Sequence, residues 1–203
     1  MQIGMMPAKL VHILINIGIK ERGEEKRGEI TLYDPFTGFG TTGLLANALG
    51  YKFIGSDKNI TPAKQNITRR KSTSRHQDIP ITLFKHDISK PFMNPVLHHT
   101  DCIITEGRLG PIMRHRVTQK QADENQKKVE ELLKSFFLHT LNFFEHITII
   151  ITIPFYNNCQ NTLAKNLINR YQKKDPQTKF HVLDEIYTRK GQHVGRQIMI
   201  VKK

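Results

Sequence analysis

Short runs of apolar residues alternate with longer amphipathic segments along most of the chain. Strands are predicted for residues 29–33, 51–57, 81–87, 101–107 and 147–155. The last of these runs, ITIIITIPF, is nearly all apolar, as expected of a strand that is buried on both faces. Helices are predicted between them, at residues 41–50, 61–75 (a basic helix and loop) and 121–146. This alternation indicates βαβ units, and therefore an α/β fold with a parallel sheet.

The two ends of the chain differ from this alternation. Residues 6–18, MPAKLVHILINIG, predict an amphipathic helix, and residues 21–29 a charged connector. Near the C-terminus, residues 179–189 and 195–203 flank a turn around Lys190 and Gly191 that leaves no room for a helix, so we expect an antiparallel hairpin at the sheet edge. We expect one domain over residues 1–203, with residues 1–28 as N-terminal helix and connector and residues 29–203 as the core.

The longest predicted helix, at residues 121–146, carries an apolar stripe at helical spacing. The stripe consists of Leu132, Leu133, Phe136, Phe137, Leu141 and Phe144. Such a stripe predicts that one face of this helix packs on the sheet.

The composition of the chain bears on its binding partner and on its cellular compartment. The 203 residues include 38% hydrophobic and 24% charged residues, which is typical of a globular protein, and carry a formal charge of +13. Such a positive field attracts nucleic-acid phosphates. Two cysteines without a CxxC spacing favour the reducing cytoplasm, and the start of the chain lacks the features of a signal peptide. The apolar runs are too short to span a membrane, and the ten histidines form no HxxxH or HExxH pattern, so we expect neither membrane insertion nor a metal.

Basic residues gather in two places. The first cluster follows the second predicted strand and consists of Lys64, Arg69, Arg70, Lys71 and Arg75. The second follows the fourth predicted strand and consists of Arg108, Arg114 and Arg116. Both are candidate nucleic-acid contacts, and the alternative for the first cluster is a solvated basic helix.

The stretch DPFTGFGTTG, residues 34–43, follows the first predicted strand and matches the glycine spacing of dinucleotide-binding loops. Leu44 stands where a nucleoside-triphosphate loop needs lysine, which argues against that class. The Asp34 carboxylate would repel a pyrophosphate by a few kcal/mol at an effective dielectric of about 20, whereas it would attract an ammonium group. S-adenosylmethionine carries an ammonium and a sulfonium and has no phosphate. The loop therefore favours S-adenosylmethionine, while an NAD-dependent oxidoreductase stays open as a weaker alternative.

Acidic residues also end the second and third predicted strands, at Asp57 and Asp87. Carboxyl ends of parallel strands meet at one crevice, where open α/β sheets bind ligands. We expect Asp57 to accept from the ribose hydroxyls and Asp87 from the adenine amine, with Lys58 and Ile88 beside the ring. Each acid alone would be explained by a cap or turn, but three together favour a ligand. The expected cofactor-binding residues of the loop itself are Asp34, Pro35, Phe36, Thr37, Gly38, Gly40, Thr41 and Thr42.

The run from DPFTGFG to NITPAKQNI resembles the class I S-adenosylmethionine-dependent methyltransferases. Within them it is similar to the RNA methylase group that includes the tRNA guanosine-N2 methyltransferases, and to related amino-methylating DNA enzymes. The group's first motif is commonly DPFCGSG, from which Thr37 and Phe39 depart. RKGQHVGRQIMIV resembles the closing hairpin of the group. The resemblance implies a Rossmann-like, seven-stranded, mostly parallel sheet with a C-terminal antiparallel hairpin, S-adenosylmethionine as cofactor, and a nucleic-acid substrate, RNA and in particular tRNA.

The catalytic motif of this group, [DN]-P-P-[YF], follows the fourth strand, where this chain has TEGRLGP. In the group, the acid or amide and the first proline carbonyl accept from the target amine, and the aromatic ring stacks on the base. Glu106 takes the acid position, Gly107 keeps a carbonyl, and the Arg108 guanidinium can stack on a base. The resemblance therefore implies that Glu106, Gly107 and Arg108 are catalytic.

The altered motif leaves a second function class open, because the two prolines and the aromatic residue are missing. The chain would then be a weakened methyltransferase fold that binds RNA or activates a partner. The tRNA enzymes of the group usually carry an RNA-binding module, and nothing of that size precedes Met6. We therefore expect RNA capture by the domain's own basic surface or by a protein partner.

Overall fold

The structure is a computed structural model of the 203-residue chain, and it describes all residues except 1–5, 24–28, 72–78, 112 and 114. The side chains of Arg70 and Lys71 also lie outside the description. The elements are α1 (Ala8–Arg22), β1 (Thr31–Asp34), α2 (Thr41–Ala48), β2 (Lys52–Asp57), α3 (Thr61–Lys71), β3 (Ile81–Lys85), the 3-10 helix η2 (Pro95–His99), β4 (Cys102–Glu106), α4 (Gln119–Phe143), β5 (Thr148–Tyr156), α5 (Leu163–Gln172), β6 (Lys179–Tyr187) and β7 (Val194–Lys202).

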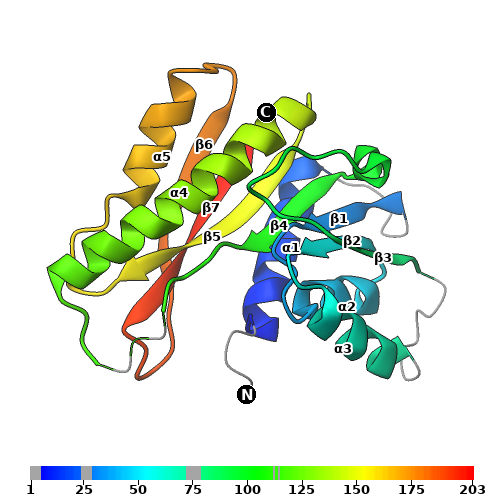
Figure 1. Ribbon diagram of the computed structural model, residues 1–203, viewed down its shortest axis with the longest axis horizontal. Coiled ribbons are helices and arrows are strands. Elements are labelled where there is room, and N and C mark those ends of the chain that lie inside the picture. Colours follow the sequence, from blue (N-terminus) through cyan, green and yellow to red (C-terminus); the bar gives the residue numbers. More distant parts are fainter. Residues whose placement is uncertain (1–5, 24–28, 72–78, 112, 114) are drawn as a thin grey trace.

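The strands form one seven-stranded sheet in the order β3-β2-β1-β4-β5-β7-β6 (Figure 1). The first five strands in this order are parallel, and β7 runs antiparallel to both β5 and β6. The predicted fold class is therefore confirmed, including the C-terminal hairpin. The predicted turn contains Gly191, whose φ is +81°.

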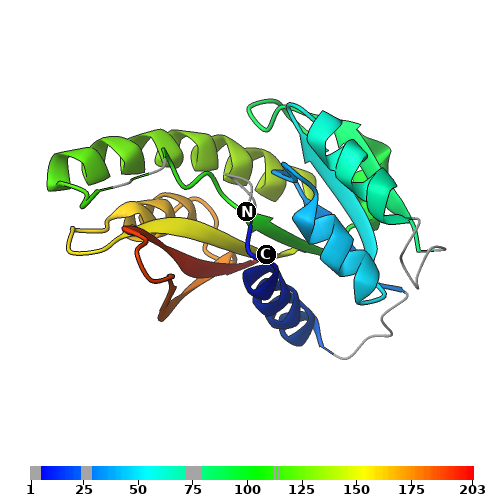
Figure 2. The same ribbon diagram turned by 90° about the horizontal axis from the view of Figure 1, so that it is seen from below.

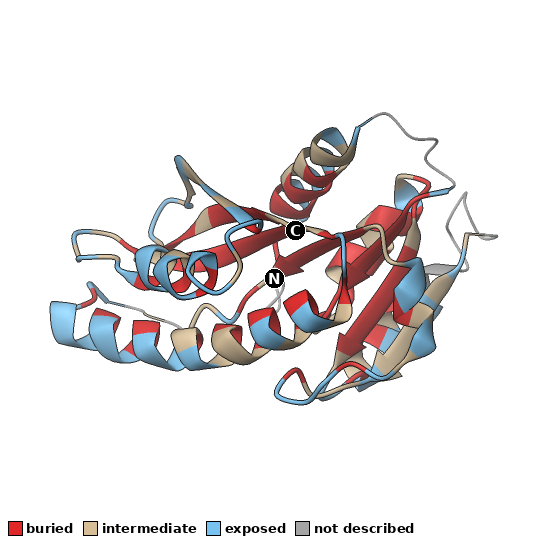
Figure 3. Cartoon of the chain, turned by 90° about the horizontal axis from the view of Figure 1, so that it is seen from above, coloured by how far each residue is buried: buried red, intermediate tan, exposed pale blue. Residues whose placement is uncertain are grey.

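Helices cover both faces of the sheet, with α1 on one side and α4 along the other (Figure 2). The apolar residues of α1 pack with Ile104 of β4 and Ile150 of β5, whereas α4 packs with Ile103 and Ile149 of the same two strands. Successive strand residues point to opposite faces, so strands that are buried on both sides consist mainly of apolar residues. Figure 3 shows these central strands as buried between the two helical layers.

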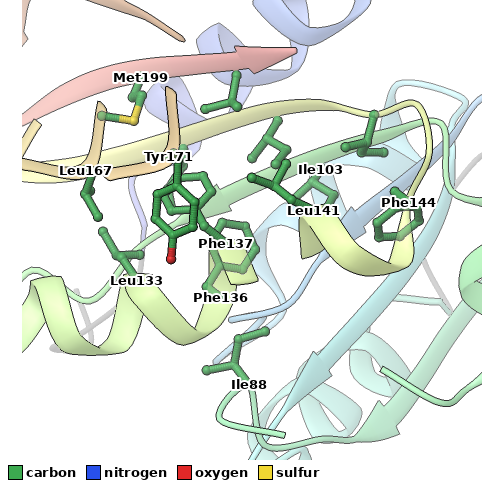
Figure 4. Packing of buried hydrophobic residues seen from close by; sticks show 14 of the residues in the cluster. Ile88, Ile103, Leu133, Phe136, Phe137, Leu141, Phe144, Leu167, Tyr171 and Met199 are labelled. Carbon is green, nitrogen blue, oxygen red and sulfur yellow. The ribbon is translucent and has the colours of Figure 1, made fainter. Parts of the chain in front are cut away.

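The apolar stripe of α4 forms the core on its side of the sheet (Figure 4). All six predicted residues belong to this layer, although Leu132 is only partly buried. The helix begins at Gln119, two residues before its predicted start, because the Thr118 side chain caps it in a reciprocal capping box with Gln121. It ends at Phe143, earlier than the predicted 146, where Phe144 turns to extended backbone.

Two helical elements went unpredicted. Helix α5 buries Leu163, Leu167 and Tyr171 at a four-residue spacing, but it is only 10 residues long. The 3-10 helix η2 begins with Pro95, and the Asn94 side chain caps it. Within the described ranges, no helix is both long and apolar enough to cross a membrane.

Candidate active site

A cavity of about 860 Å³ lies where β1, β2 and β4 end at their carboxyl termini. It brings together most of the residues that the sequence predicts for a site. Those that line it are Asp34, Pro35, Phe36, Thr37, Gly38, Thr41, Thr42, Asp57, Lys58, Ile88, Glu106, Gly107 and Arg108. Residues that were not predicted as site residues also line the cavity, including Met6 before α1 and Arg189, Gln192 and His193 at the β6–β7 turn.

Two of the predicted cofactor residues, Gly40 and Asp87, are not part of the cavity lining. Gly40 has a φ of +78°, and a Cβ at this position would lie 3.3 Å from the Ala63 side chain of α3. Glycine is therefore needed at residue 40 for the left-handed turn into α2 and for close packing against α3. That requirement is independent of any ligand.

Asp34 is held by three hydrogen bonds at the floor of the site. Its Oδ1 accepts from the Phe36 amide (3.0 Å) and the Thr105 hydroxyl (2.6 Å), and its Oδ2 accepts from the Thr42 hydroxyl (2.7 Å). The residue is only 1% exposed. Burial raises the pKa of Asp34 from 3.8 to about 6, although the three hydrogen bonds oppose the rise. A cation in the cavity would therefore change the protonation of this carboxyl.

Asp57 joins the end of β2 to the glycine loop. Its Oδ2 accepts from the Gly38 amide and its Oδ1 from the Asn59 amide, both at 3.0 Å. These bonds fix the carboxylate at the edge of the cavity, between the loop and the start of α3. It lies beside Lys58, which also lines the cavity.

Asp87 lies two residues beyond the end of β3, because the strand stops at Lys85. Its Oδ1 accepts from the Ser89 amide (2.9 Å) and hydroxyl (2.7 Å), and its Oδ2 is 3.1 Å from Lys58 Nζ. The two Ser89 bonds, helped by Lys58, lower the pKa of Asp87 to about 2. The carboxylate thus already caps a local turn and pairs with a lysine that faces the cavity.

Glu106 forms an ion pair that the sequence did not suggest. Its Oε1 accepts from Arg196 Nε of β7 at 2.5 Å, and the side chains are 14% and 9% exposed, respectively. Burial raises the pKa of the Glu106 carboxyl, and the guanidinium opposes that rise. The only signal in the sequence was an arginine inside the mostly apolar strand VGRQIMIV, and it gave no hint of its partner.

The turn after β4 is held by β5. The Gly107 amide donates to the Thr152 carbonyl (3.1 Å), and a Cβ at residue 107 would lie 3.0 Å from that oxygen, so this position favours glycine. The Tyr156 hydroxyl donates to the Leu109 carbonyl (3.4 Å). These contacts place Glu106, Gly107 and Arg108 on the same side of the cavity.

Among the predicted nucleic-acid residues that the structure describes, Arg108 lines the cavity, whereas Lys64, Arg69 and Arg116 do not. Arg69 is exposed on α3, and Arg116 is exposed just before α4. Arg70 and Lys71 end α3, but their side chains are not described, and Arg75 and Arg114 lie outside the described residues. Elsewhere in the described chain, no group of three or more His, Cys, Asp or Glu residues is placed to hold a metal ion.

Comparisons with known proteins agree with this architecture. Residues 3–68 match a family model described as DNA methylase, of the N6/N4 methyltransferases. The structure is similar to TrmN from Thermus thermophilus, with a TM-score of 0.60 at 14% identity. The match covers 98% of this chain but 49% of TrmN, so the chain spans about half of that protein.

Two further solved structures have the same fold. The METTL16 methyltransferase domain gives a TM-score of 0.65 at 12% identity, over 98% of this chain and 84% of that domain. Magnesium protoporphyrin IX methyltransferase from Synechocystis PCC 6803, solved with S-adenosylhomocysteine, gives a TM-score of 0.55 at 11% identity, over 100% of this chain and 90% of that protein. A search of curated protein sequences found no match. The chain has the class I S-adenosylmethionine-dependent methyltransferase fold.

Proposed function

We propose that the protein is an S-adenosylmethionine-dependent methyltransferase that modifies a base amino group of a nucleic acid, and that this nucleic acid is RNA, in particular tRNA. The observation that carries the proposal is the cavity that joins the DPFTGFG loop to the Glu106–Gly107 turn. The DNA methylase match over residues 3–68 supports amino methylation of a nucleic acid, and the charge of +13 supports a phosphate-bearing partner. As part of the same proposal, the protein acts in the cytoplasm, because its two cysteines without a CxxC spacing suit a reducing compartment.

The cavity suits S-adenosylmethionine in size and charge. Ligand cavities commonly measure about 300–1,000 Å³, and this one measures about 860 Å³. Asp34 would face the amino-acid moiety above the backbone of residues 37–40, and Asp57 would hold the ribose. Lys58 and Ile88 would flank the adenine, with Asp87 near its amine. The cofactor supplies an electrophilic methyl group on a sulfonium.

The chain's own residues would position the acceptor. Glu106 Oε2 and the Gly107 carbonyl can accept hydrogen bonds from an amino group, which directs the nitrogen lone pair towards the methyl group. Arg108, exposed at the rim, can stack on the base. Alignment of this kind supplies much of the rate in such a transfer, with little need for a strong base.

Replacement of Asp57 by alanine tests the cofactor assignment. We expect the affinity for S-adenosylmethionine to fall by about 1.5–3 kcal/mol, because charge-assisted hydrogen bonds to the ribose are lost. Calorimetric titration with S-adenosylmethionine, S-adenosylhomocysteine and NAD measures the effect. Asp184→Ala, an exposed position on β6, is the matched control. An unchanged titration for Asp57→Ala would contradict the assignment, and tight NAD binding would favour an oxidoreductase.

Nucleic-acid binding should depend on salt. Neutralisation of phosphates releases counterions, so the logarithm of affinity should fall linearly with the logarithm of salt concentration. If Arg69 contacts a phosphate, Arg69→Gln should reduce the slope by about one. Fluorescence titrations with RNA and DNA of equal length measure both slopes, and Arg170→Gln on α5 controls for the change in net charge. Absence of binding to either polymer at low salt would remove the nucleic-acid assignment.

A second candidate function is a cofactor-binding protein with weakened catalysis, which binds RNA or activates a partner. The Glu106–Arg196 ion pair favours it, because one oxygen of the carboxylate is already engaged. A methyl-transfer assay on bulk RNA from cells lacking the protein separates the two. Incorporation by the wild type supports the enzyme, whereas good cofactor binding without incorporation supports the weakened fold.

A further inference from the structure

The Glu106–Arg196 ion pair links two strands that are not neighbours. Arg196 lies on β7 opposite Pro154 of β5, and its guanidinium reaches past β5 to the end of β4. Both side chains line the cavity. Arg196 Nη1 also donates to Gln192 Oε1 at 3.5 Å, so the guanidinium is held from two sides.

The pair leaves hydrogen-bonding capacity on both partners. Among the described residues, Glu106 Oε2 makes no hydrogen bond, and Arg196 uses only Nε and Nη1. A guanidinium has five N–H donors in a fixed plane, and a carboxylate oxygen is only an acceptor. The cavity therefore contains an acceptor and a donor side by side, on groups that hold each other in place.

We propose, on the basis of the function proposed above, that Glu106 and Arg196 read the target base as one unit. Glu106 Oε2 accepts from the exocyclic amino group, and the free Nη donor of Arg196 hydrogen-bonds the neighbouring ring nitrogen. Arg196 is thus a specificity-determining residue of the site, contributed by the strand furthest from the glycine loop along the chain.

This donor–acceptor pattern selects among bases. Adenine and cytosine each have an amino group beside an unprotonated ring nitrogen, N1 or N3, which accepts. Guanine has N1–H on the Watson–Crick side of its amino group, and that donor would face the guanidinium, whereas its acceptor N3 lies on the other side, next to the sugar. A base that presents its Watson–Crick edge to the pair therefore fits as adenine or cytosine. A buried ion pair gives little net stability compared with apolar packing, so a purely structural role accounts poorly for it.

Deaza bases test the role of Arg196, because they remove the ring nitrogen and keep the amino group. The probes are short single-stranded RNAs that contain one adenosine, 1-deazaadenosine, cytidine, 3-deazacytidine or guanosine in an otherwise uridine sequence. Binding is measured with S-adenosylhomocysteine present, and methyl transfer with S-adenosylmethionine. We expect the wild type to bind and methylate the preferred parent base at least about tenfold better than its deaza form, as for a hydrogen bond from a charged donor.

Variants of Arg196 supply the second arm. Arg196→Gln should lose about tenfold on the parent base and should no longer distinguish it from the deaza form. Arg196→Lys keeps the positive charge beside Glu106 but lacks the fork, so it should fold like the wild type and also lose the discrimination. Thermal unfolding checks the fold of each variant. Arg170→Gln, on α5, should discriminate as the wild type does.

The outcomes separate the inference from the function on which it rests. Methylation of parent and deaza bases at equal rates by the wild type would overturn the inference and leave the methyltransferase in place. The inference would also be overturned if both Arg196 variants still distinguished the parent base from its deaza form, or if guanosine were the preferred substrate. If no probe is bound or methylated by a protein that binds the cofactor, the proposed nucleic-acid methyltransferase fails, and the reading unit fails with it.

Discussion

Asp34→Asn is expected to be more stable than the wild type at pH 7 and to bind S-adenosylmethionine at least about tenfold more weakly. The amide fits the hydrogen bonds around Asp34, because Oδ1 can still accept from Phe36 and Thr105 while Nδ2 donates to the Thr42 hydroxyl. It also removes a fully buried charge. If the Asp34 charge faces the cofactor ammonium as proposed, its loss should weaken binding by the usual size of a charge-assisted hydrogen bond.

The sign of the pH dependence follows from the pKa of Asp34. In the folded protein this pKa is about 6, above the ordinary 3.8, so the folded state binds the proton more tightly than the unfolded state. The stability contributed by protonation is fully present below pH 3.8 and is lost as the pH rises through about 6. The shift corresponds to about 3 kcal/mol at 1.36 kcal/mol per unit. The asparagine variant should lack this loss between pH 4 and 7.

Urea unfolding at several pH values measures the stability difference, and calorimetry measures the cofactor affinity. Asp184→Asn, on the exposed side of β6, controls for the change in charge. An asparagine variant that is less stable at pH 7, or whose stability follows the same pH dependence as the wild type, would contradict the account of Asp34. Cofactor binding at wild-type strength would show that its charge does not serve the ligand.

The position of Asp34 and Asp57 at one cavity could be predicted because each follows directly from a local strand pattern. Asp34 and Asp57 each end a strand in a parallel sheet, and the carboxyl ends of such strands meet at one edge. Strand position alone was enough to place both at one cavity. Strand position was a less exact guide for Asp87, because β3 ends two residues earlier and the Asp87 side chain contacts Ser89 and Lys58.

The Glu106–Arg196 ion pair on the other side of the cavity could not be predicted from local patterns. Arg196 meets Glu106 only because β7 inserts between β5 and β6 with a particular register, in which Arg196 lies opposite Pro154. A one-residue change of register would place the arginine on the other face of the sheet. Helix α5 was missed for a different reason, because only three of its residues, at a four-residue spacing, carry the burial signal.

Glu106→Gln is expected to reduce methyl transfer by about 100-fold or more while cofactor affinity stays the same. The glutamine would hold the target amine in the wrong position, and a misplacement of about 1 Å in the reacting groups already has an effect of this size. The carboxylate serves two donors, since one oxygen accepts from Arg196 and the other would accept from the target amine. Glutamine has only one acceptor, so in either orientation its NH₂ group faces a donor. Glu106→Asp keeps both acceptors but is one methylene shorter, so it should retain part of the rate.

The measurement is incorporation of labelled methyl groups into RNA at saturating cofactor, with a parallel calorimetric titration for each variant. Glu185→Gln, exposed on β6, is the matched control. Glu106→Ala complements the series, although it leaves the buried Arg196 charge without a partner, so its thermal stability must be compared with that of Glu106→Gln. Full incorporation by the glutamine variant, or incorporation that survives in the alanine variant, would refute the catalytic role of Glu106. Loss of transfer with intact cofactor binding would place this carboxylate at the reacting amine.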